Sequence, residues 1–138
     1  MKKIYLGMAL KGTPDWWNTA FQSDVRQALE IFTDYEVTKF VGLTGADPLE
    51  IYTTDINLAK SADVMIALTR FPSIGLGMEI QSRIDLGQPT ILCHPEVVPL
   101  SSMVLGAPGL AVIYYGHSPQ DSVDAANEIV VQLQSYLN

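Results

Sequence analysis

Short, unbroken apolar runs alternate with amphipathic segments along this chain, and this alternation limits the folds open to it more than any other feature. Apolar runs without interspersed polar residues are typical of parallel strands that are buried on both faces. The amphipathic segments repeat apolar side chains at three- and four-residue steps, as helices do when one side packs on a sheet. We predict strands at residues 3–6, 35–41, 63–68, 90–93 and 110–115, and helices at residues 16–32, 48–60, 76–86 and 118–137.

Strands and helices in this order predict an α/β fold, in which helices cover both faces of a five-stranded parallel sheet. We expect the strand order 2-1-3-4-5 of a flavodoxin/Rossmann-like domain. In such sheets the ligand crevice lies at the carboxyl ends of the strands, where the order reverses between the first and third strands. With 138 residues, no internal repeat and no low-complexity linker, the chain is expected to form one domain over residues 1–138.

The composition argues against several classes of partner. The net charge is −7 and Lys2-Lys3 is the only adjacent basic pair, so we expect no binding to nucleic-acid polymers or anionic membranes. Cys93 is the single cysteine, which excludes an internal disulfide and predicts a cytoplasmic protein. No apolar run is long enough for a signal peptide or a membrane span. His94 and His117 lack the spacing of a metal site, and we expect neither a metal nor an organic cofactor.

A glycine-rich stretch, residues 71–79, leads from a predicted strand into a predicted helix. Such a turn offers backbone N–H groups at the positive end of a helix dipole, where α/β folds bind ligands. Glu79 is expected in the first turn of that helix, where the dipole would hold its carboxylate ionised. That position suits a nucleophile or an acceptor for a substrate hydroxyl. It suits a helix cap equally well, so the turn alone leaves both roles open.

Asp55 is expected to approach Glu79 at the mouth of the crevice. The helix predicted at residues 48–60 begins near the same sheet edge, and Asp55 lies about two turns into it. Two carboxylates in different environments are the usual equipment for cleaving a glycosidic bond. Asp55, if partly buried, would be the one with the raised pKa. A solvent-facing Asp55 is equally compatible with the pattern. Asp63 is expected at the opposite edge, in a structural role.

Several segments together resemble a known family. They are Ile4-Tyr5-Leu6, Tyr52-Thr53-Thr54-Asp55-Ile56-Asn57, Ser61-Ala62-Asp63-Val64, Gly75-Leu76-Gly77-Met78-Glu79-Ile80 and Gly87-Gln88-Pro89. In this order they resemble the nucleoside 2-deoxyribosyltransferase superfamily over nearly the whole chain. The resemblance implies that Glu79 is the nucleophile that attacks C1′ and forms a glycosyl-enzyme ester. It also implies that Asp55 binds the base and supplies its proton, and that Tyr5 positions the nucleophile.

Two serines separate the branches of this superfamily. Transferases that act on free nucleosides carry Asp in the place of Ser73 and Asn in the place of Ser101. This chain resembles the 2′-deoxynucleoside 5′-phosphate N-hydrolases instead, in which a serine hydroxyl can donate to the phosphate that a carboxylate would repel. The resemblance implies that Ser73, Gly75 and Gly77 bind the substrate. It also implies that Ser101 reaches into a neighbouring subunit's site, in a homodimer or a higher assembly.

The first loop departs from the family pattern. The family has Gly-Ser-x-Arg-Gly where this chain has Met8-Ala9-Leu10-Lys11-Gly12. Lys11 and Gly12 remain candidate substrate contacts, but a lysine lacks the planar fork of an arginine, which leaves phosphate affinity open. Arg70, which follows a predicted strand, is a second candidate for anion binding, and His94 is a candidate substrate contact. Helical phase assigns Trp17 to the core and leaves Trp16 free to stack on a base or to pack on the surface.

Three functions are compatible with the sequence. The first is an N-glycosidase that hydrolyses (deoxy)nucleoside 5′-monophosphates to a free base and (deoxy)ribose 5-phosphate. The second is a deoxyribosyltransferase that exchanges the bases of deoxynucleosides. The third is a non-catalytic module that binds nucleotides. In each case the partner is a small nucleotide or nucleoside, and the sequence does not indicate the preferred base or whether a 2′-hydroxyl is tolerated.

Overall fold

The structure is a computed structural model, and it describes residues 1–38 and 47–137. Its centre is a parallel sheet of five strands in the order β2-β1-β3-β4-β5, which confirms the predicted fold class and order. The strands are β1 (Lys3–Met8), β2 (Glu36–Thr38), β3 (Val64–Leu68), β4 (Thr90–Pro95) and β5 (Leu110–Tyr115). The helices are η1 (Trp17–Phe21), α1 (Gln22–Phe32), α2 (Pro48–Ser61), α3 (Ile74–Asp85), α4 (Ser102–Gly106) and α5 (Ser122–Leu137).

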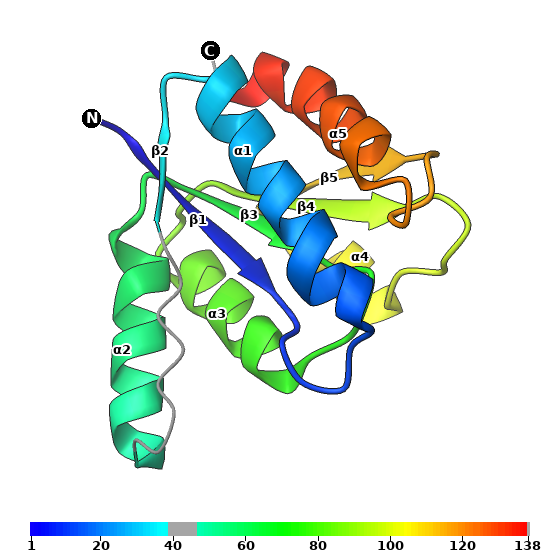
Figure 1. Ribbon diagram of the computed structural model, residues 1–138. Helices are drawn as coiled ribbons and strands as arrows, with labels where there is room; N and C mark the ends of the chain where they lie inside the picture. Colours follow the sequence, from blue (N-terminus) through cyan, green and yellow to red (C-terminus); the bar gives the residue numbers. More distant parts are fainter. Residues whose placement is uncertain (39–46, 138) are drawn as a thin grey trace.

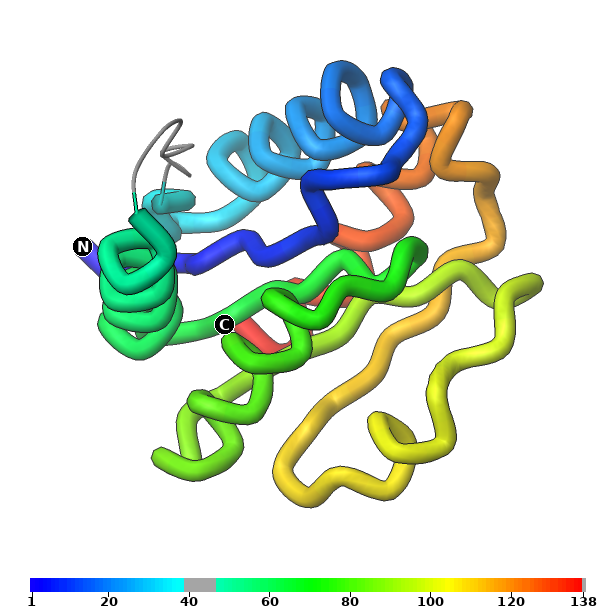
Figure 2. The backbone as a smooth tube through the Cα atoms, turned by 90° about the horizontal axis from the view of Figure 1, so that it is seen from below, coloured from blue at the N-terminus to red at the C-terminus, as the bar shows by residue number. Residues whose placement is uncertain are grey.

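Helices cover both faces of the sheet (Figure 1). One core cluster joins side chains of η1, α1 and α5 to the sheet, and a second cluster joins those of α2 and α3. In Figure 2, α1 and α3 lie on opposite sides of the strands. Because side chains alternate along a strand, Ile4 and Leu6 of β1 enter the first cluster while Tyr5 enters the second. Tyr5 therefore lies on the same face of the sheet as α2 and α3.

The predicted elements differ from the observed ones mainly at their ends. The strands β1 and β4 run two residues further than expected, to Met8 and Pro95. The predicted helix at residues 16–32 is a π-helix followed by α1, and the last helix begins at Ser122 rather than at residue 118. The short helix α4 was not expected. Residues 39–41 of the second predicted strand lie outside the described residues.

Two polar contacts at the amino edge of the sheet fix the helices that carry the candidate carboxylates. Arg83 of α3 is fully buried, and its guanidinium donates to the carbonyl oxygens of Ala59 and Ala62 at 3.0 and 2.6 Å. These carbonyls close the end of α2, so the arginine ties α2 to α3. Asp63 accepts a hydrogen bond of 2.7 Å from the backbone N–H of Lys3, which confirms its structural role. No helix within residues 1–38 and 47–137 has both the length and the apolar character needed to cross a bilayer.

Candidate functional site

The carboxylate of Glu79 is the most unusual polar group near the carboxyl edge of the sheet. Its Oε2 atom is buried and has no hydrogen-bond partner among the described residues. The pKa of Glu79 is raised to about 7: burial raises it most, a hydrogen bond with Tyr5 lowers it, and the nearby charge of Asp55 raises it. Burial thus opposes the ionisation that the helix dipole was expected to favour. Since α3 begins at Ile74, Glu79 lies in the second turn, where the dipole is weaker and burial dominates.

Tyr5 faces Glu79 from β1. Its side chain is 2% exposed, and burial is the largest cause of a pKa raised well above the ordinary value for tyrosine. The negative charge of Glu79 and the hydrogen bond to it raise this pKa as well, and Asp55 adds a smaller effect. The phenol therefore stays neutral at any physiological pH. A neutral hydroxyl can donate to the carboxylate, and it limits the positions that the carboxylate adopts.

Asp55 completes the group from α2. Asp47 caps this helix by accepting a hydrogen bond of 2.9 Å from the N–H of Glu50, and Pro48 occupies the first helical position. Asp55 is half-buried, and burial raises its pKa, as predicted. Its charge influences the pKa values of both Tyr5 and Glu79. The structure thus brings together the three residues that were predicted to be catalytic.

The turn before α3 contains three predicted substrate contacts. Ser73 is the N-cap of α3, and its hydroxyl oxygen accepts a hydrogen bond of 3.3 Å from the N–H of Leu76. The hydroxyl hydrogen stays available for donation to a ligand. Gly75 and Gly77 both lie inside the first turn of the helix, which begins two residues earlier than predicted. A Cβ atom added at Gly77 would meet no described atom within 4 Å, so the space above this backbone is open.

The first loop is held by aromatic residues. The indole N–H of Trp17, which is fully buried as predicted, donates to the carbonyl oxygen of Ala9 at 2.9 Å. Lys11 is exposed, and Gly12 has a φ of 70°, a conformation that glycine adopts without strain. Trp16 is half-buried and packs with its ring centroid 5.9 Å from that of Phe71. This contact agrees with the packing role of Trp16, and base stacking by it stays a prediction.

Ser101 and Arg70 lie on neighbouring connections. Ser101 precedes α4 and is exposed, and its hydroxyl makes no capping hydrogen bond. Its side chain is free to reach another molecule, so a role in a neighbouring subunit's site stays a prediction. The guanidinium of Arg70 lies 4.6 Å from the centroid of the Phe71 ring. Arg70 thus stacks on a side chain that also packs against Trp16.

His94, a candidate substrate contact in the sequence, is buried inside the protein. The side chain is 2% exposed, and both ring nitrogens have hydrogen-bond partners inside the protein. The sequence shows only that a histidine ends a strand. Its burial depends on the loop after β4, whose conformation no local pattern predicts.

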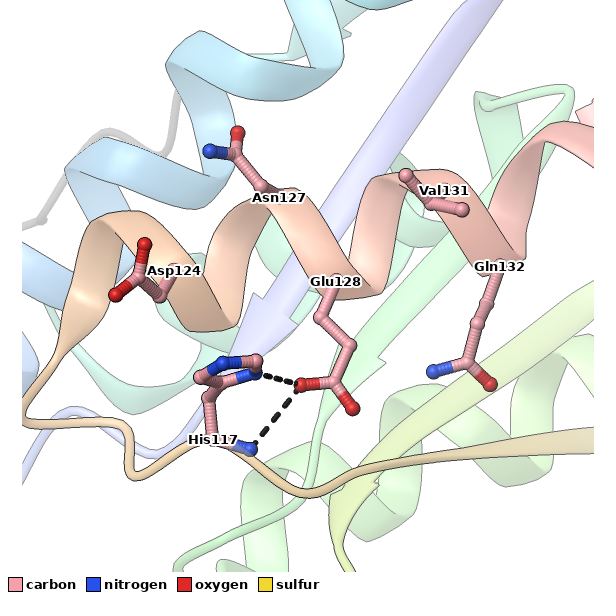
Figure 3. Close-up of a pocket in the computed structure, with 6 residues that line it drawn as sticks. All are labelled: His117, Asp124, Asn127, Glu128, Val131 and Gln132. Carbon is pink, nitrogen blue, oxygen red and sulfur yellow. Dashed lines mark hydrogen bonds and ion pairs between the residues drawn. The ribbon is translucent and has the colours of Figure 1, made fainter.

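The described pockets lie away from the predicted site residues. One is an open hollow beside α5, lined by His117, Asp124, Asn127, Glu128, Val131 and Gln132 (Figure 3). The carboxylate of Glu128 accepts hydrogen bonds from the His117 ring and from two backbone N–H groups, of Gly116 at 2.7 Å and His117 at 3.1 Å. These contacts close the connection between β5 and α5. Within residues 1–38 and 47–137, no three His, Cys, Asp or Glu side chains gather as they would around a metal ion.

Comparisons with known proteins identify relatives of this chain. A protein of Thermofilum pendens named "Putative 2′-deoxynucleoside 5′-phosphate N-hydrolase 1" is 34% identical over 112 residues, which are 75% of this chain and 77% of that protein. The CMP N-glycosidase of Clostridium botulinum matches the fold with a TM-score of 0.72 at 21% identity, over 99% of this chain and 100% of its own. A 2-deoxyribosyltransferase of Bacillus psychrosaccharolyticus has a TM-score of 0.61 at 18% identity, over 88% and 90%. The fold is thus that of the nucleoside 2-deoxyribosyltransferases. No protein-family model matches the sequence.

Proposed function

Because this chain belongs to the family of 2′-deoxynucleoside 5′-phosphate N-hydrolases, we propose that it is a nucleotide N-glycosidase. It hydrolyses the bond between base and sugar in (deoxy)nucleoside 5′-monophosphates and releases a free base and (deoxy)ribose 5-phosphate. The observation that carries the proposal is the buried, unpartnered Oε2 of Glu79 beside Tyr5 and Asp55. A carboxylate oxygen without a hydrogen bond is costly to bury, and a nucleophile is a good reason to keep one.

The proposed reaction is a double displacement. In the first step a carboxylate oxygen of Glu79 bonds to C1′ while the bond between C1′ and the base nitrogen breaks, and Asp55 protonates the departing base. In the second step water attacks C1′ and releases Glu79 as a carboxylate, and the water's proton returns to Asp55. Two inversions give overall retention at C1′. The reactive form has Glu79 ionised and Asp55 protonated.

The phosphate is proposed to bind at the start of α3. The Ser73 hydroxyl can donate to it, and the N–H groups of Ile74 and Gly75 have no acceptor within their own helix. The open space above Gly77 gives a ligand close access to this backbone. Lys11 from the first loop supplies a positive charge, and Gly12 provides the turn that carries it. Ser101 is proposed to add a donor from the other subunit of a homodimer.

The test is the release of free base from a panel of ribo- and deoxynucleoside 5′-monophosphates and from the matching nucleosides. Chromatography measures the released base. We expect release from monophosphates and little from nucleosides. Glu79→Ala should abolish release, since it removes the carboxylate that forms the ester, while its circular dichroism stays that of the wild type. Wild-type turnover by Glu79→Ala would exclude the mechanism.

The same panel separates the other two functions. If an added second base accelerates release and appears in a new nucleoside, the protein is a transferase. If monophosphates raise the melting temperature without any release of base, it is a binding module.

A further inference from the structure

His94 is a buried polar side chain to which the proposed mechanism gives no role. It lies in β4, one residue before the strand ends at the sheet edge that carries the candidate site. Its Nδ1 atom lies 2.8 Å from the hydroxyl oxygen of Thr69, and its Nε2 atom lies 2.8 Å from the carbonyl oxygen of Val98. With 2% exposure the ring cannot reach a ligand. Any effect of His94 on the reaction must therefore pass through these two partners.

The partners determine where the ring carries its hydrogen. A carbonyl oxygen only accepts, so Nε2 must carry a hydrogen and donate it to Val98. In the neutral ring Nδ1 is then an acceptor, so the Thr69 hydroxyl donates its one hydrogen across the 2.8 Å contact to Nδ1 rather than to the carbonyl oxygen of Cys93, which lies 3.3 Å away. A ring with both nitrogens engaged has one favoured orientation. His94 thus acts as a brace between the side chain of Thr69 and the backbone of Val98.

This brace joins the segment after β3, which contains Ser73, to the segment after β4, which contains Ser101. Both serines are proposed to bind the substrate's phosphate. Thr69 follows β3 and lies four residues before Ser73, the N-cap of α3. Val98 follows β4 and lies three residues before Ser101, the N-cap of α4. Since β3 and β4 are neighbouring parallel strands, both connections leave the same edge of the sheet.

Further hydrogen bonds make both ends of the brace firm. The backbone N–H of Thr69 donates to the carbonyl oxygen of Cys93 at 3.2 Å, which extends the pairing with β4 beyond the end of β3. On the other side, the N–H of Val98 donates to the carbonyl oxygen of Pro95 at 3.3 Å. The N–H of Glu96 donates to the carbonyl oxygen of Tyr115 at 3.0 Å, which anchors this turn to β5. The ring of His94 is the side chain that links the two anchored segments.

We infer that His94 is a positioning residue for recognition of the substrate's phosphate. It holds the connection of Ser73 and the connection of Ser101 in a fixed relation, so that both hydroxyls are ordered before the nucleotide binds. Donors that are already ordered bind more tightly, because no loop has to lose conformational freedom on binding. The inference rests on the proposed function. Since Ser101 is proposed to serve the partner's site, each His94 positions one donor for each of the two sites.

The experiment compares kcat and KM for the monophosphate that the wild type hydrolyses best. His94→Phe keeps the volume of the ring and removes both hydrogen bonds, and Thr69→Val removes one of them. We expect both variants to raise KM, by about tenfold for His94→Phe, with kcat within about twofold of the wild type. His94→Gln, which retains an amide near the position of Nε2, should restore most of the affinity.

The matched control is Thr33→Val. The Thr33 hydroxyl also makes local hydrogen bonds, to Leu29 and Tyr35, but lies at the end of α1 away from the candidate site. It should leave KM unchanged. A fall in kcat without a change in KM in His94→Phe, or an equal rise of KM in Thr33→Val, would show a merely structural role and overturn the inference.

Two further measurements keep the inference testable if the proposed function fails. Hydrogen exchange should become faster in His94→Phe at residues 69–76 and 96–106 and stay unchanged in α1 and α5; unchanged exchange in the two connections contradicts the brace. If the wild type releases no base at all, the proposed function is wrong. Calorimetry with ribose 5-phosphate then decides: weaker binding to His94→Phe than to the wild type supports the inference, whereas equal binding, or none to the wild type, overturns it.

Discussion

Burial of Glu79 has two opposite effects on its proposed role as a nucleophile. Burial of Oε2 without a partner removes the solvation that would make a carboxylate a weak nucleophile, yet the same burial raises the pKa of Glu79 to about 7. About half of the molecules therefore carry the ionised form at neutral pH. The hydrogen bond from Tyr5 is the one contact that lowers this pKa. In the proposed mechanism, Tyr5 thus increases the fraction of Glu79 that is ionised.

Tyr5→Phe should shift the pH dependence of base release. Phenylalanine keeps the packing but removes the donor that stabilises the ionised carboxylate, so the pKa of Glu79 should rise above about 7. The acid limb of kcat/KM, where activity grows as Glu79 loses its proton, should then move to higher pH. Tyr35→Phe, at a half-buried tyrosine that follows α1, is the control and should leave the profile unchanged. A shift to lower pH would contradict the role of Tyr5.

The raised pKa of Glu79 also makes a prediction about stability. A carboxyl group whose pKa rises from 4.5 in the unfolded chain to about 7 in the folded one binds its proton more tightly when folded. The fold therefore loses stability as the pH rises from about 4.5 to about 7. Above this window the loss is complete, on the order of 3 kcal/mol.

Glu79→Gln removes this titration and should be more stable than the wild type at pH 8, with a much smaller gain at pH 4. Urea denaturation at the two pH values measures the difference. Glu36→Gln, at an exposed carboxylate of β2, serves as the control and should show no such pH-dependent gain. Equal stability of Glu79→Gln and the wild type at pH 8 would mean that the carboxylate is not buried at a cost.

At the level of elements, the start of α3 shows how a capping side chain overrides a local propensity. Gly75 and Gly77 disfavour helix, and we expected the helix to begin between them, at Leu76. The Ser73 side chain instead accepts from the N–H of Leu76 and starts the helix at Ile74. The two glycines are thus helical residues without side chains beside a proposed phosphate site.

Gly77→Ala should separate stability from binding. Alanine is favoured over glycine in a helix by about 0.5–1 kcal/mol, and its Cβ atom would meet no described atom within 4 Å. The variant should therefore melt at or above the wild-type temperature. If a nucleotide occupies the open space, the added methyl group should raise KM several-fold. An unchanged KM would place the substrate elsewhere.

The sequence predicted the sheet well because each strand is a short apolar run, and runs buried on both faces are recognisable without knowledge of their neighbours. The proximity of Asp55 and Glu79 was predicted because the helices that carry them begin near the same edge of the sheet, where the parallel strands end. The resemblance to the family predicted that Tyr5 belongs to the same site. The rise in the pKa of Glu79 was not foreseen because it depends on how deeply the folded chain buries this side chain. The brace at His94 was missed because it joins segments from two loops, and α4 was missed because its five residues are too few to show a period.

At the level of the whole molecule, apolar side chains stand exposed on the helices that carry the two serines. Ile74 in α3 and Met103 in α4 are 87% and 88% exposed, and Leu105 is 56% exposed. Isolated exposed apolar residues are ordinary, but several on the elements of one edge favour contact with another molecule. A second copy of the chain would cover them, and it would bring the uncapped hydroxyl of Ser101 to the neighbouring site, as the resemblance implies.

Complementation between an inactive variant and a variant with weakened substrate binding tests this homodimer directly. In a dimer of Glu79→Ala and Ser101→Ala subunits, one site lacks both groups, while the other combines an intact Glu79 with an intact Ser101 from the partner. If subunits pair at random after co-expression at equal levels, half of the dimers are mixed and half of their sites are intact. Activity at low substrate should then reach about a quarter of the wild-type value, above the residual activity of Ser101→Ala alone. If Ser101 acts within its own subunit, no intact site forms in any dimer, and activity should stay at the mean of the two parent variants. Light scattering on the same samples shows whether a dimer is present, so a monomeric protein is distinguished from a dimer that does not share its sites.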